Sequence, residues 1–438
     1  MNSQSETVRQ YVLERLENGE FRGGMRLPGS RKIAEATGVS RPVVQSALDT
    51  LVNEGLLRAV SRSGLYVDEA WTGRRICNCL RVYTTDAYLP WMPLLRKEIA
   101  ENLPELHISH RCEEGSFEIV TTAVAQTCWR EFADLMPVLK KCYPDLSVFH
   151  QTLLRPFMQK ERLTALPFLF SPRLIACNRG MLKAAGCAEP DPQWTLQDFS
   201  FLVKQLQKHF PPEKIFPWNN SYYCWMNFIL SSGGGLFSQE KADPVCFDAP
   251  EAIEALKLFQ SLRTGKIASS FESIFDCDKF ALSIIDRQIY GLNREKLDRD
   301  FLFLPIPGIT PAHTGKSIQA TELLVMRRGC VDHGLCLPLI RFLWSEKFQD
   351  HLAELRYGIP LRRSSMERAF DAASDADRAF ENVLDRLSSE YHLSSPDLFR
   401  LISQGLTKIL AGNEEVACQV KELAFVVRKY LKYTQKDY

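Results

Sequence analysis

Basic side chains in the first part of the chain stand where helices and a tight turn are expected to begin. Arg31 and Lys32 open one predicted helix, Arg41 opens the next, and Arg62 lies in a serine-rich turn. Such side chains bind the phosphate oxygens and base edges of a nucleic-acid duplex. The whole chain has a net charge of only +1, so a contact with a polyanion must come from a local patch of this kind.

The elements expected to hold these side chains are short helices. Apolar residues at helical spacing predict one helix over residues 5–17, and a second one runs from Ser30 to Thr37. Ser40 is a suitable N-cap for a third helix, because its hydroxyl can accept a hydrogen bond from a free backbone N–H. Four apolar positions give that third helix a stripe that is expected to be buried: Val44, Ala47, Leu48 and Leu51.

A hairpin is expected directly after the third helix. Residues 56–60 and 65–67 have the composition of short strands and flank a Ser-Arg-Ser-Gly turn. Three helices followed by a hairpin form the order of a winged helix-turn-helix, of class α+β, over residues 1–68. A small helical bundle without a nucleic-acid role is the alternative. Segment 22–62 argues against it, because it carries seven Lys and Arg and only three acidic residues.

Residues 5–68 resemble the GntR-type winged-helix DNA-binding domain. The ordered matches are Leu27-Pro28-x-Ser30-Arg31-x-Ile33-Ala34, Gly38-Val39-Ser40-Arg41-Pro42-x-Val44, Ala47-Leu48-x-x-Leu51, Glu54-Gly55-Leu56-Leu57 and Arg62-x-Gly64-x-Tyr66-Val67. The resemblance implies contacts with double-stranded DNA from the second helix, the start of the third helix and the wing. The residues expected to make them are Arg31, Ser40, Arg41, Val43, Gln45, Arg62 and Gly64.

One position departs from the pattern of that family. Gln45 stands where the family often has an arginine. Glutamine pairs well with adenine, whereas arginine pairs with guanine. The operator of this protein is therefore expected to differ at that base.

After a linker expected over residues 69–76, the chain changes to an alternation of strands and helices. The first elements expected are a strand over 80–83, a helix over 91–102, and strands over 106–110 and 117–121. This alternation predicts an α/β domain with a parallel sheet between helices. Ligands of such sheets bind beyond the carboxyl ends of the strands. Those ends are residues 84–91 and 121–125.

A second resemblance covers about residues 77–436. The motifs are loose but ordered: Leu174-Ile175-Ala176-Cys177-Asn178, Met181-Leu182-x-x-Ala185-Gly186, Trp194-Thr195, Phe247-Asp248-x-Pro250-Glu251-Ala252 and Leu304-Pro305-Ile306-Pro307-Gly308. They are similar to the extracellular solute-binding proteins of sugar ABC transporters, type 1. The resemblance implies a two-lobed periplasmic-binding-protein-like domain (type II) over 77–438. One lobe is expected at about 77–175 and 313–345, and the other at about 176–312 and 346–438.

Residues near the predicted strand ends are candidates for contacts with a small ligand. They are Tyr88, Trp91, Thr122, Trp225, Asp286 and Thr321, with Trp91 and Trp225 preferred. Aromatic faces pack on the C–H surfaces of sugars, while polar groups bond to the hydroxyls. Segment 218–225 also brings Tyr222 and Tyr223. The alternative for each aromatic residue is packing in a core, where large rings are common.

The sequence gives little support for a metal site, a nucleotide site or an enzymatic activity. His107 and His110 fall on opposite faces of a strand, so no metal is expected. The sequence has no phosphate-binding glycine loop of the G-x-x-x-x-G-K-[ST] type, and neither an enzymatic activity nor a cofactor is expected. The 13 cysteines are expected to be reduced thiols. A polar beginning and the lack of a long apolar stretch predict no export signal and no membrane span, which favours the cytoplasm.

Together these patterns predict a transcription regulator that responds to a ligand. It would bind a DNA operator as a homodimer and sense a small effector, such as a carbohydrate. The first alternative is a solute-binding component of a sugar transport system, retained or exported by an unrecognised route. A fused enzyme is the second, although no cofactor lysine in a recognisable setting supports it.

Overall fold

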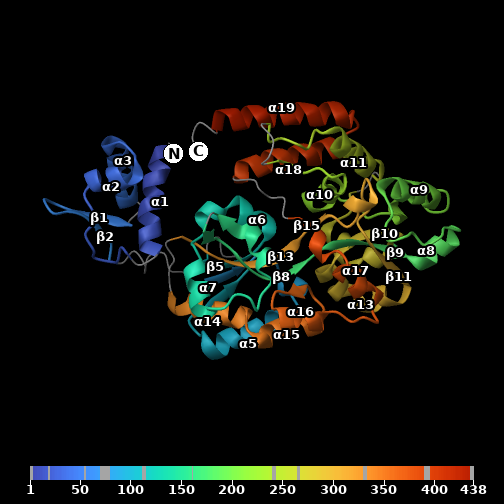
Figure 1. Ribbon diagram of the computed structural model, residues 1–438, viewed down its shortest axis with the longest axis horizontal. Helices are drawn as coiled ribbons and strands as arrows, with labels where there is room; N and C mark the ends of the chain where they lie inside the picture. Colours follow the sequence, from blue (N-terminus) through green and yellow to red (C-terminus); the bar gives the residue numbers. More distant parts are fainter. Residues whose placement is uncertain are drawn as a thin grey trace.

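The computed structural model describes residues 3–17, 20–53, 56–69, 79–110, 115–159, 161–238, 243–263, 267–328, 333–388 and 395–434. A small domain at one end lies beside a longer body made of two lobes (Figure 1). Residues 70–76 of the expected linker lie outside the described residues.

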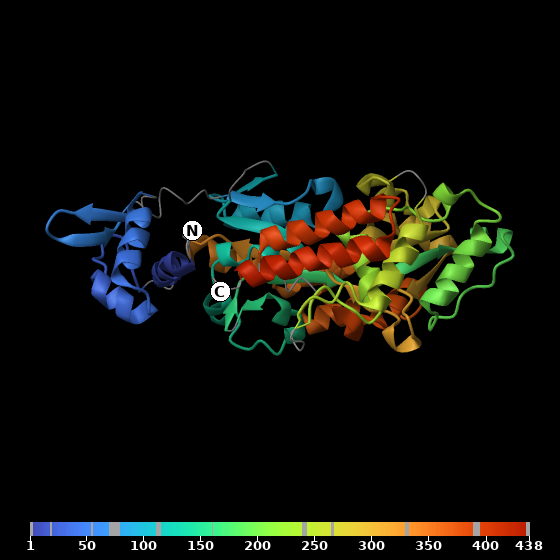
Figure 2. The same cartoon turned by 90° about the horizontal axis from the view of Figure 1, so that it is seen from above.

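The small domain has three helices and a two-stranded hairpin. These are α1 (Ser3–Glu17), α2 (Ser30–Thr37), α3 (Arg41–Asn53), β1 (Leu57–Val60) and β2 (Gly64–Val67). The apolar stripe predicted for α3 is buried in the core of this domain, together with Val8 and Val12 of α1 and Ile33 of α2. The predicted winged helix-turn-helix is confirmed, and its hairpin points away from the two-lobed body (Figure 2).

The first lobe is built on a six-stranded sheet in the order β14-β8-β13-β5-β3-β4. The strands are β3 (Cys79–Val82), β4 (His107–Ser109), β5 (Phe117–Thr121), β8 (Leu166–Ser171), β13 (Ala320–Met326) and β14 (Ile359–Pro360). β3 runs parallel to β4 and β5, as predicted, but β13 runs antiparallel to both β5 and β8. The sheet is therefore mixed, because β13 enters it from the second lobe in the opposite direction.

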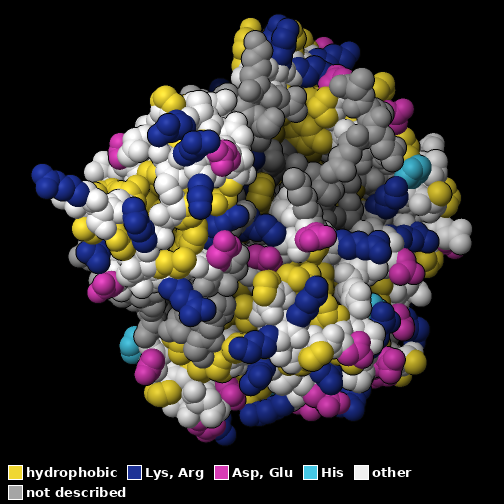
Figure 3. Space-filling model, turned by 60° about the vertical axis from the view of Figure 1, so that its left-hand side comes forward, with side chains coloured by type: hydrophobic (Ala, Val, Ile, Leu, Met, Phe, Trp, Pro, Cys, Tyr) yellow, Lys and Arg dark blue, Asp and Glu magenta, His cyan; other side chains and the backbone are white. Residues whose placement is uncertain are grey.

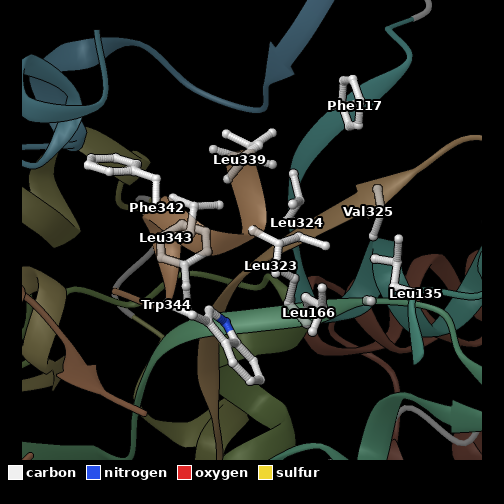
Figure 4. Close-up of a cluster of buried hydrophobic side chains, with 14 of the residues drawn as sticks. Phe117, Leu135, Leu166, Leu323, Leu324, Val325, Leu339, Phe342, Leu343 and Trp344 are labelled. Carbon is white, nitrogen blue, oxygen red and sulfur yellow. The ribbon is translucent and has the colours of Figure 1, made fainter. Parts of the chain in front are cut away.

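Helices cover this sheet and close the core of the first lobe. They include α5 (Met92–Asn102), α6 (Thr122–Thr127), α7 (Met136–Cys142), α14 (His333–Leu343) and α15 (Glu346–Leu355). Figure 4 shows Leu339 and Leu343 of α14 beside Leu323 of β13, with Trp344 next to Leu166. The Trp344 indole N–H donates to the Pro167 carbonyl at 2.9 Å, so the one polar atom of this ring is satisfied inside the core.

The second lobe has a three-stranded antiparallel sheet in the order β10-β9-β11. Its strands are β9 (Arg173–Asn178), β10 (Leu282–Asp286) and β11 (Phe301–Pro305). The main core of this lobe lies between the sheet and a group of helices: α8 (Arg179–Ala184), α9 (Leu196–Leu206), α10 (Tyr222–Ser231), α11 (Pro250–Ser261), α18 (Pro396–Ala411) and α19 (Val416–Thr434). A smaller core involves α13 (Arg287–Asp300) and α17 (Asp375–Glu381), with α12 (Ser270–Phe275) nearby.

Three segments of the chain join the two lobes. β8 continues through Pro172 into β9, β12 (Ser317–Ile318) precedes β13, and the chain after α16 (Arg363–Ala369) returns to α17. The serine hydroxyls at the first two crossings accept hydrogen bonds from backbone N–H groups of the second lobe. The Arg173 N–H donates to Ser317 Oγ at 3.0 Å, and the Arg287 N–H donates to Ser171 Oγ at 2.8 Å.

The third crossing corrects the lobe boundary expected from the sequence. Segment 346–369 is predicted in the second lobe, yet Phe348, Leu352 and Ile359 belong to the core of the first. The reason is that β14 pairs with β8 at the edge of the first sheet, and α15 packs beside it. The chain leaves the first lobe only after α16.

Candidate nucleic-acid interface and ligand cavity

The exposed face of α3 carries polar side chains that a duplex could meet. Arg41 and Gln45 are exposed, whereas Val43 is half-buried. Gln45 Nε2 donates to Asp49 Oδ1 at 3.0 Å, one helical turn further on. This bond holds the Gln45 amide on the outer face of the helix and leaves its carbonyl oxygen and second N–H for another partner.

The basic side chains around α3 are available to bind phosphate. Arg31 Nε lies 3.1 Å from Glu35 Oε1, but both side chains are exposed, and such pairs stabilise a helix by only about 0.3–0.5 kcal/mol. For Arg41 and Arg62, no ion pair is found among the residues that the structure describes. Lys and Arg side chains are spread over the side of the molecule shown in Figure 3.

The turn of the wing depends on two residues in the left-handed region. Arg62 has a φ of 59° and Gly64 a φ of 115°. A Cβ atom at Gly64 would also lie 3.3 Å from Arg26 Nε. The Ser63 and Tyr66 hydroxyls hydrogen-bond at 2.6 Å across the turn. The hairpin is thereby held with the exposed Arg62 side chain at its tip.

A cavity of about 430 Å³ lies between the two lobes. The first lobe and its hinge strand β13 contribute Tyr83, Thr84, Tyr88, Thr121, Thr122, Thr321, Glu322 and Tyr357, and the second lobe contributes Arg173, Phe216, Tyr222, Tyr223, Ile284 and Asp286. Several of these residues follow β3 and β5 directly. The cavity therefore lies beyond the carboxyl ends of these parallel strands, where the sequence predicted a ligand site.

Four of the six predicted ligand residues line this cavity: Tyr88, Thr122, Asp286 and Thr321. The Thr122 and Thr321 hydroxyls hydrogen-bond to each other, which joins α6 to β13. The ring of Tyr88 lies 5.1 Å from the ring of Phe275 in the second lobe. This ring pair is a contact between the lobes at the edge of the cavity.

The structure does not place the two preferred tryptophans in the cavity lining. Trp91 is 0% exposed and packs edge-to-face on Phe168, with ring centres 5.3 Å apart. Trp225 is 1% exposed in the core of the second lobe. Both tryptophans, preferred above as ligand contacts, instead fill cores, as large aromatic rings usually do. From α10, Tyr222 and Tyr223 face the cavity instead.

An ion pair fixes the second-lobe wall of the cavity. Arg173 Nη1 lies 3.2 Å from Asp286 Oδ2, and both side chains are about 10% exposed or less. Asp286 also caps α13, because its Oδ1 accepts a hydrogen bond from the Ile289 N–H at 2.9 Å. The Arg173 guanidinium lies 5.5 Å from the centre of the Tyr223 ring. These contacts leave both charged groups with partners.

Glu322 is a residue of the cavity that the sequence analysis did not select. It is 1% exposed, and its Oε1 lies 2.9 Å from the Tyr357 hydroxyl and 3.4 Å from the Tyr83 hydroxyl. Burial raises the pKa of the Glu322 carboxyl to about 8. A signal was present, since an acidic residue inside the apolar strand Ala320–Met326 must have a specific environment.

The fold and the cavity define a class of protein in which a winged helix-turn-helix is joined to a two-lobed binding domain. Residues 4–67 match the model of the bacterial regulatory proteins of the gntR family. The HTH-type transcriptional repressor NagR of Bacillus subtilis is 39% identical over 62 residues, which are 14% of this chain and 26% of NagR. The match thus spans about a quarter of NagR. The chain carries a GntR-type DNA-binding module at its amino-terminal end.

The remainder of the chain has the fold of sugar ABC transporter solute-binding proteins. A Thermotoga lettingae solute-binding protein, solved with bound α-D-tagatose, aligns with a TM-score of 0.68 at 14% identity, over 81% of this chain and 99% of that one. The GacH receptor of Streptomyces glaucescens aligns with a TM-score of 0.65 at 14% identity, over 81% and 98% of the two chains. The predicted two-lobed fold is therefore confirmed. In the described part of the chain, no helix is long and apolar enough to cross a membrane.

Proposed function

We propose that this protein is a DNA-binding transcription regulator that responds to a small ligand, a carbohydrate or a similar solute. The observation that carries the proposal is the cavity between the lobes, which residues of both lobes line, in a chain that also has a GntR-type winged helix. A ligand that touches both lobes can change how they are arranged, and that change can reach the attached domain.

The DNA contacts would come from α3 and the wing. In a winged helix the third helix enters the major groove with its first residues closest to the bases. In that arrangement the exposed Arg41 and Gln45 would contact base edges, and Arg31 and Arg62 would contact phosphates. Two copies on a symmetric operator would have half-sites about one helical turn apart, which supports a homodimer.

The regulation would be a shift between lobe arrangements. A ligand changes DNA affinity only by its preference for one arrangement, and such couplings are typically about 1–3 kcal/mol. A sugar is supported by the likeness to binding proteins that were solved with tagatose, acarbose or maltose, and by a cavity of threonine, tyrosine and carboxyl side chains.

A gel-shift with fragments of the host genome tests the proposal. The full chain should select specific fragments at moderate salt, and Arg41→Ala should lose that selection. Lys97→Ala is the matched control, because Lys97 is exposed on α5 in the other domain and should leave DNA binding unchanged. Specific binding that survives Arg41→Ala would refute the role of α3. Sugar binding without any specific DNA binding would favour the transport alternative.

A further inference from the structure

The cavity holds one acidic side chain without a basic partner. Among the lining residues that the structure describes, three are acidic or basic: Arg173, Asp286 and Glu322. Arg173 and Asp286 form an ion pair at 3.2 Å, which leaves the Glu322 carboxyl without a cation. Arg173 keeps one buried donor, Nε, without a partner, but its charge is already neutralised by Asp286. The cavity thus suits a ligand that brings a positive charge of its own.

The hydrogen bonds around Glu322 bear on its protonation state. The Tyr357 hydroxyl oxygen lies 2.6 Å from the Tyr88 carbonyl oxygen and 2.9 Å from Glu322 Oε1. A hydroxyl has one hydrogen, and the carbonyl can only accept it. When Tyr357 donates to Tyr88, the contact with Glu322 needs a hydrogen from the carboxyl. A protonated Glu322 would satisfy both contacts at once, and burial, which raises the pKa of this carboxyl, favours the neutral acid.

The second oxygen of this carboxyl lacks a partner. Glu322 Oε2 is buried and makes no hydrogen bond of good geometry with the residues that the structure describes, and the Trp91 indole N–H, which faces the same carboxyl, is likewise buried without one. A buried acceptor without a donor is costly, so the cavity offers a place for a ligand group with an N–H or O–H. Five tyrosines line the same cavity, and the faces of their rings attract cations.

We propose that the ligand carries a protonated primary amine on a small hydroxyl-bearing frame and that this ammonium group binds Glu322 Oε2. This inference rests on the proposed function, because it names the ligand class of the same cavity. When the ammonium binds, the carboxyl proton leaves to solvent, and Glu322 becomes a carboxylate paired with the ligand. Tyr83 can then donate to Oε1, and the single Tyr357 hydrogen can turn from the Tyr88 carbonyl to Oε1. A quaternary ammonium lacks the N–H that Oε2 requires.

Proton exchange gives the inference a signature that a neutral sugar would not produce. The groups that face Glu322 are Tyr83, Tyr357, the Trp91 indole N–H and Asp286, and none of them supplies a positive charge. At about pH 6.5 the Glu322 carboxyl of the ligand-free protein, with a pKa of about 8, is protonated, so binding of an ammonium should release close to one proton. A neutral sugar hydroxyl would leave the proton on Glu322.

Titration calorimetry of the full chain at about pH 6.5, in two buffers with different ionisation enthalpies, tests this. The probes are glucosamine, galactosamine and mannosamine, each beside its parent sugar and its neutral N-acetyl derivative. We expect one amino sugar to bind about tenfold or more tighter than both neutral counterparts, with proton release. Equal or tighter binding of a neutral counterpart overturns the inference, and so does the lack of binding by every amine at millimolar concentration.

Variants assign the effect to the carboxyl. Glu322→Gln keeps the shape of the neutral acid, so the ligand-free variant should be at least as stable as the wild type at about pH 6.5 but lose the amine preference and the proton release. Glu101→Gln, an exposed acid on α5, is the matched control and should keep both. An unchanged preference in Glu322→Gln overturns the inference. A neutral ligand that still alters DNA binding would leave the proposed function intact, whereas amine binding without DNA binding would refute only that function.

Discussion

Replacing Glu322 by glutamine is expected to remove a dependence of stability on pH. The carboxyl is 1% exposed, and burial raises its pKa from an ordinary 4.5 to about 8. The folded protein therefore holds this proton to a higher pH than the unfolded chain does. The contribution of the neutral Glu322 carboxyl to the free energy of unfolding is fully present below about pH 4.5. It is lost progressively as the pH rises to about 8.

The size of the loss follows from the two pKa values. Each unit of difference corresponds to about 1.4 kcal/mol, so the whole window contains about 5 kcal/mol. Between about pH 5.5 and 8, Glu322 lowers the free energy of unfolding by about 3 kcal/mol. This is an upper value, because the surroundings of a buried charge can relax. For a unit of 150–250 residues, this corresponds to about 6–12 °C in melting temperature.

Thermal melting of the full chain followed by circular dichroism measures the effect. Wild type, Glu322→Gln and the exposed control Glu101→Gln are compared at several pH values without ligand. Other titrating groups act in all three proteins and cancel in the differences. We expect Glu322→Gln to become progressively more stable than the wild type above about pH 5, while Glu101→Gln follows the wild type. Identical pH profiles for all three would refute the assignment of a neutral, buried carboxyl.

Further substitutions test the interface and the frame of the molecule. Arg41→Ala should weaken operator binding about tenfold or more, and, if Arg41 also contacts a phosphate, lower the salt slope by about 1, as measured by fluorescence anisotropy. Asp377→Ala removes the fully buried partner of Arg287, 2.8 Å away, and should cost about 3–5 kcal/mol in urea unfolding. The exposed Asp375→Ala on the same helix should cost far less, and equal losses would contradict the role of burial. Gly64→Ala forces a side chain at φ 115° and should destabilise the winged domain by about 1 kcal/mol or more, seen by thermal melting; an unchanged melting temperature would contradict that strain.

The parts of the fold that follow local patterns were predictable from the sequence. The stripe Val44, Ala47, Leu48 and Leu51 is buried as its helical spacing requires. The hairpin of the wing follows from its turn residues. Strands β3, β4 and β5 lie within one or two residues of the predicted ranges, because continuous apolar runs beside polar loops define them.

The errors concern contacts between distant parts of the chain. The pairing of β14 with β8, which moves 346–369 into the first lobe, joins residues that no local pattern links. The side of α10 that meets the cavity also depends on where the second lobe packs, so Tyr223 rather than Trp225 faces it. The environment of Glu322 arises only when Tyr83 and Tyr357 come together around β13.

The most direct test is a titration of labelled operator DNA with the full chain, followed by fluorescence anisotropy, with and without a saturating cavity ligand. The DNA would be a fragment selected by the wild type in the gel-shift. We expect the ligand to change the dissociation constant by about 5–150-fold, and the operator to change the ligand affinity by the same factor. The same dissociation constant with the cavity empty and filled would contradict a ligand-responsive regulator.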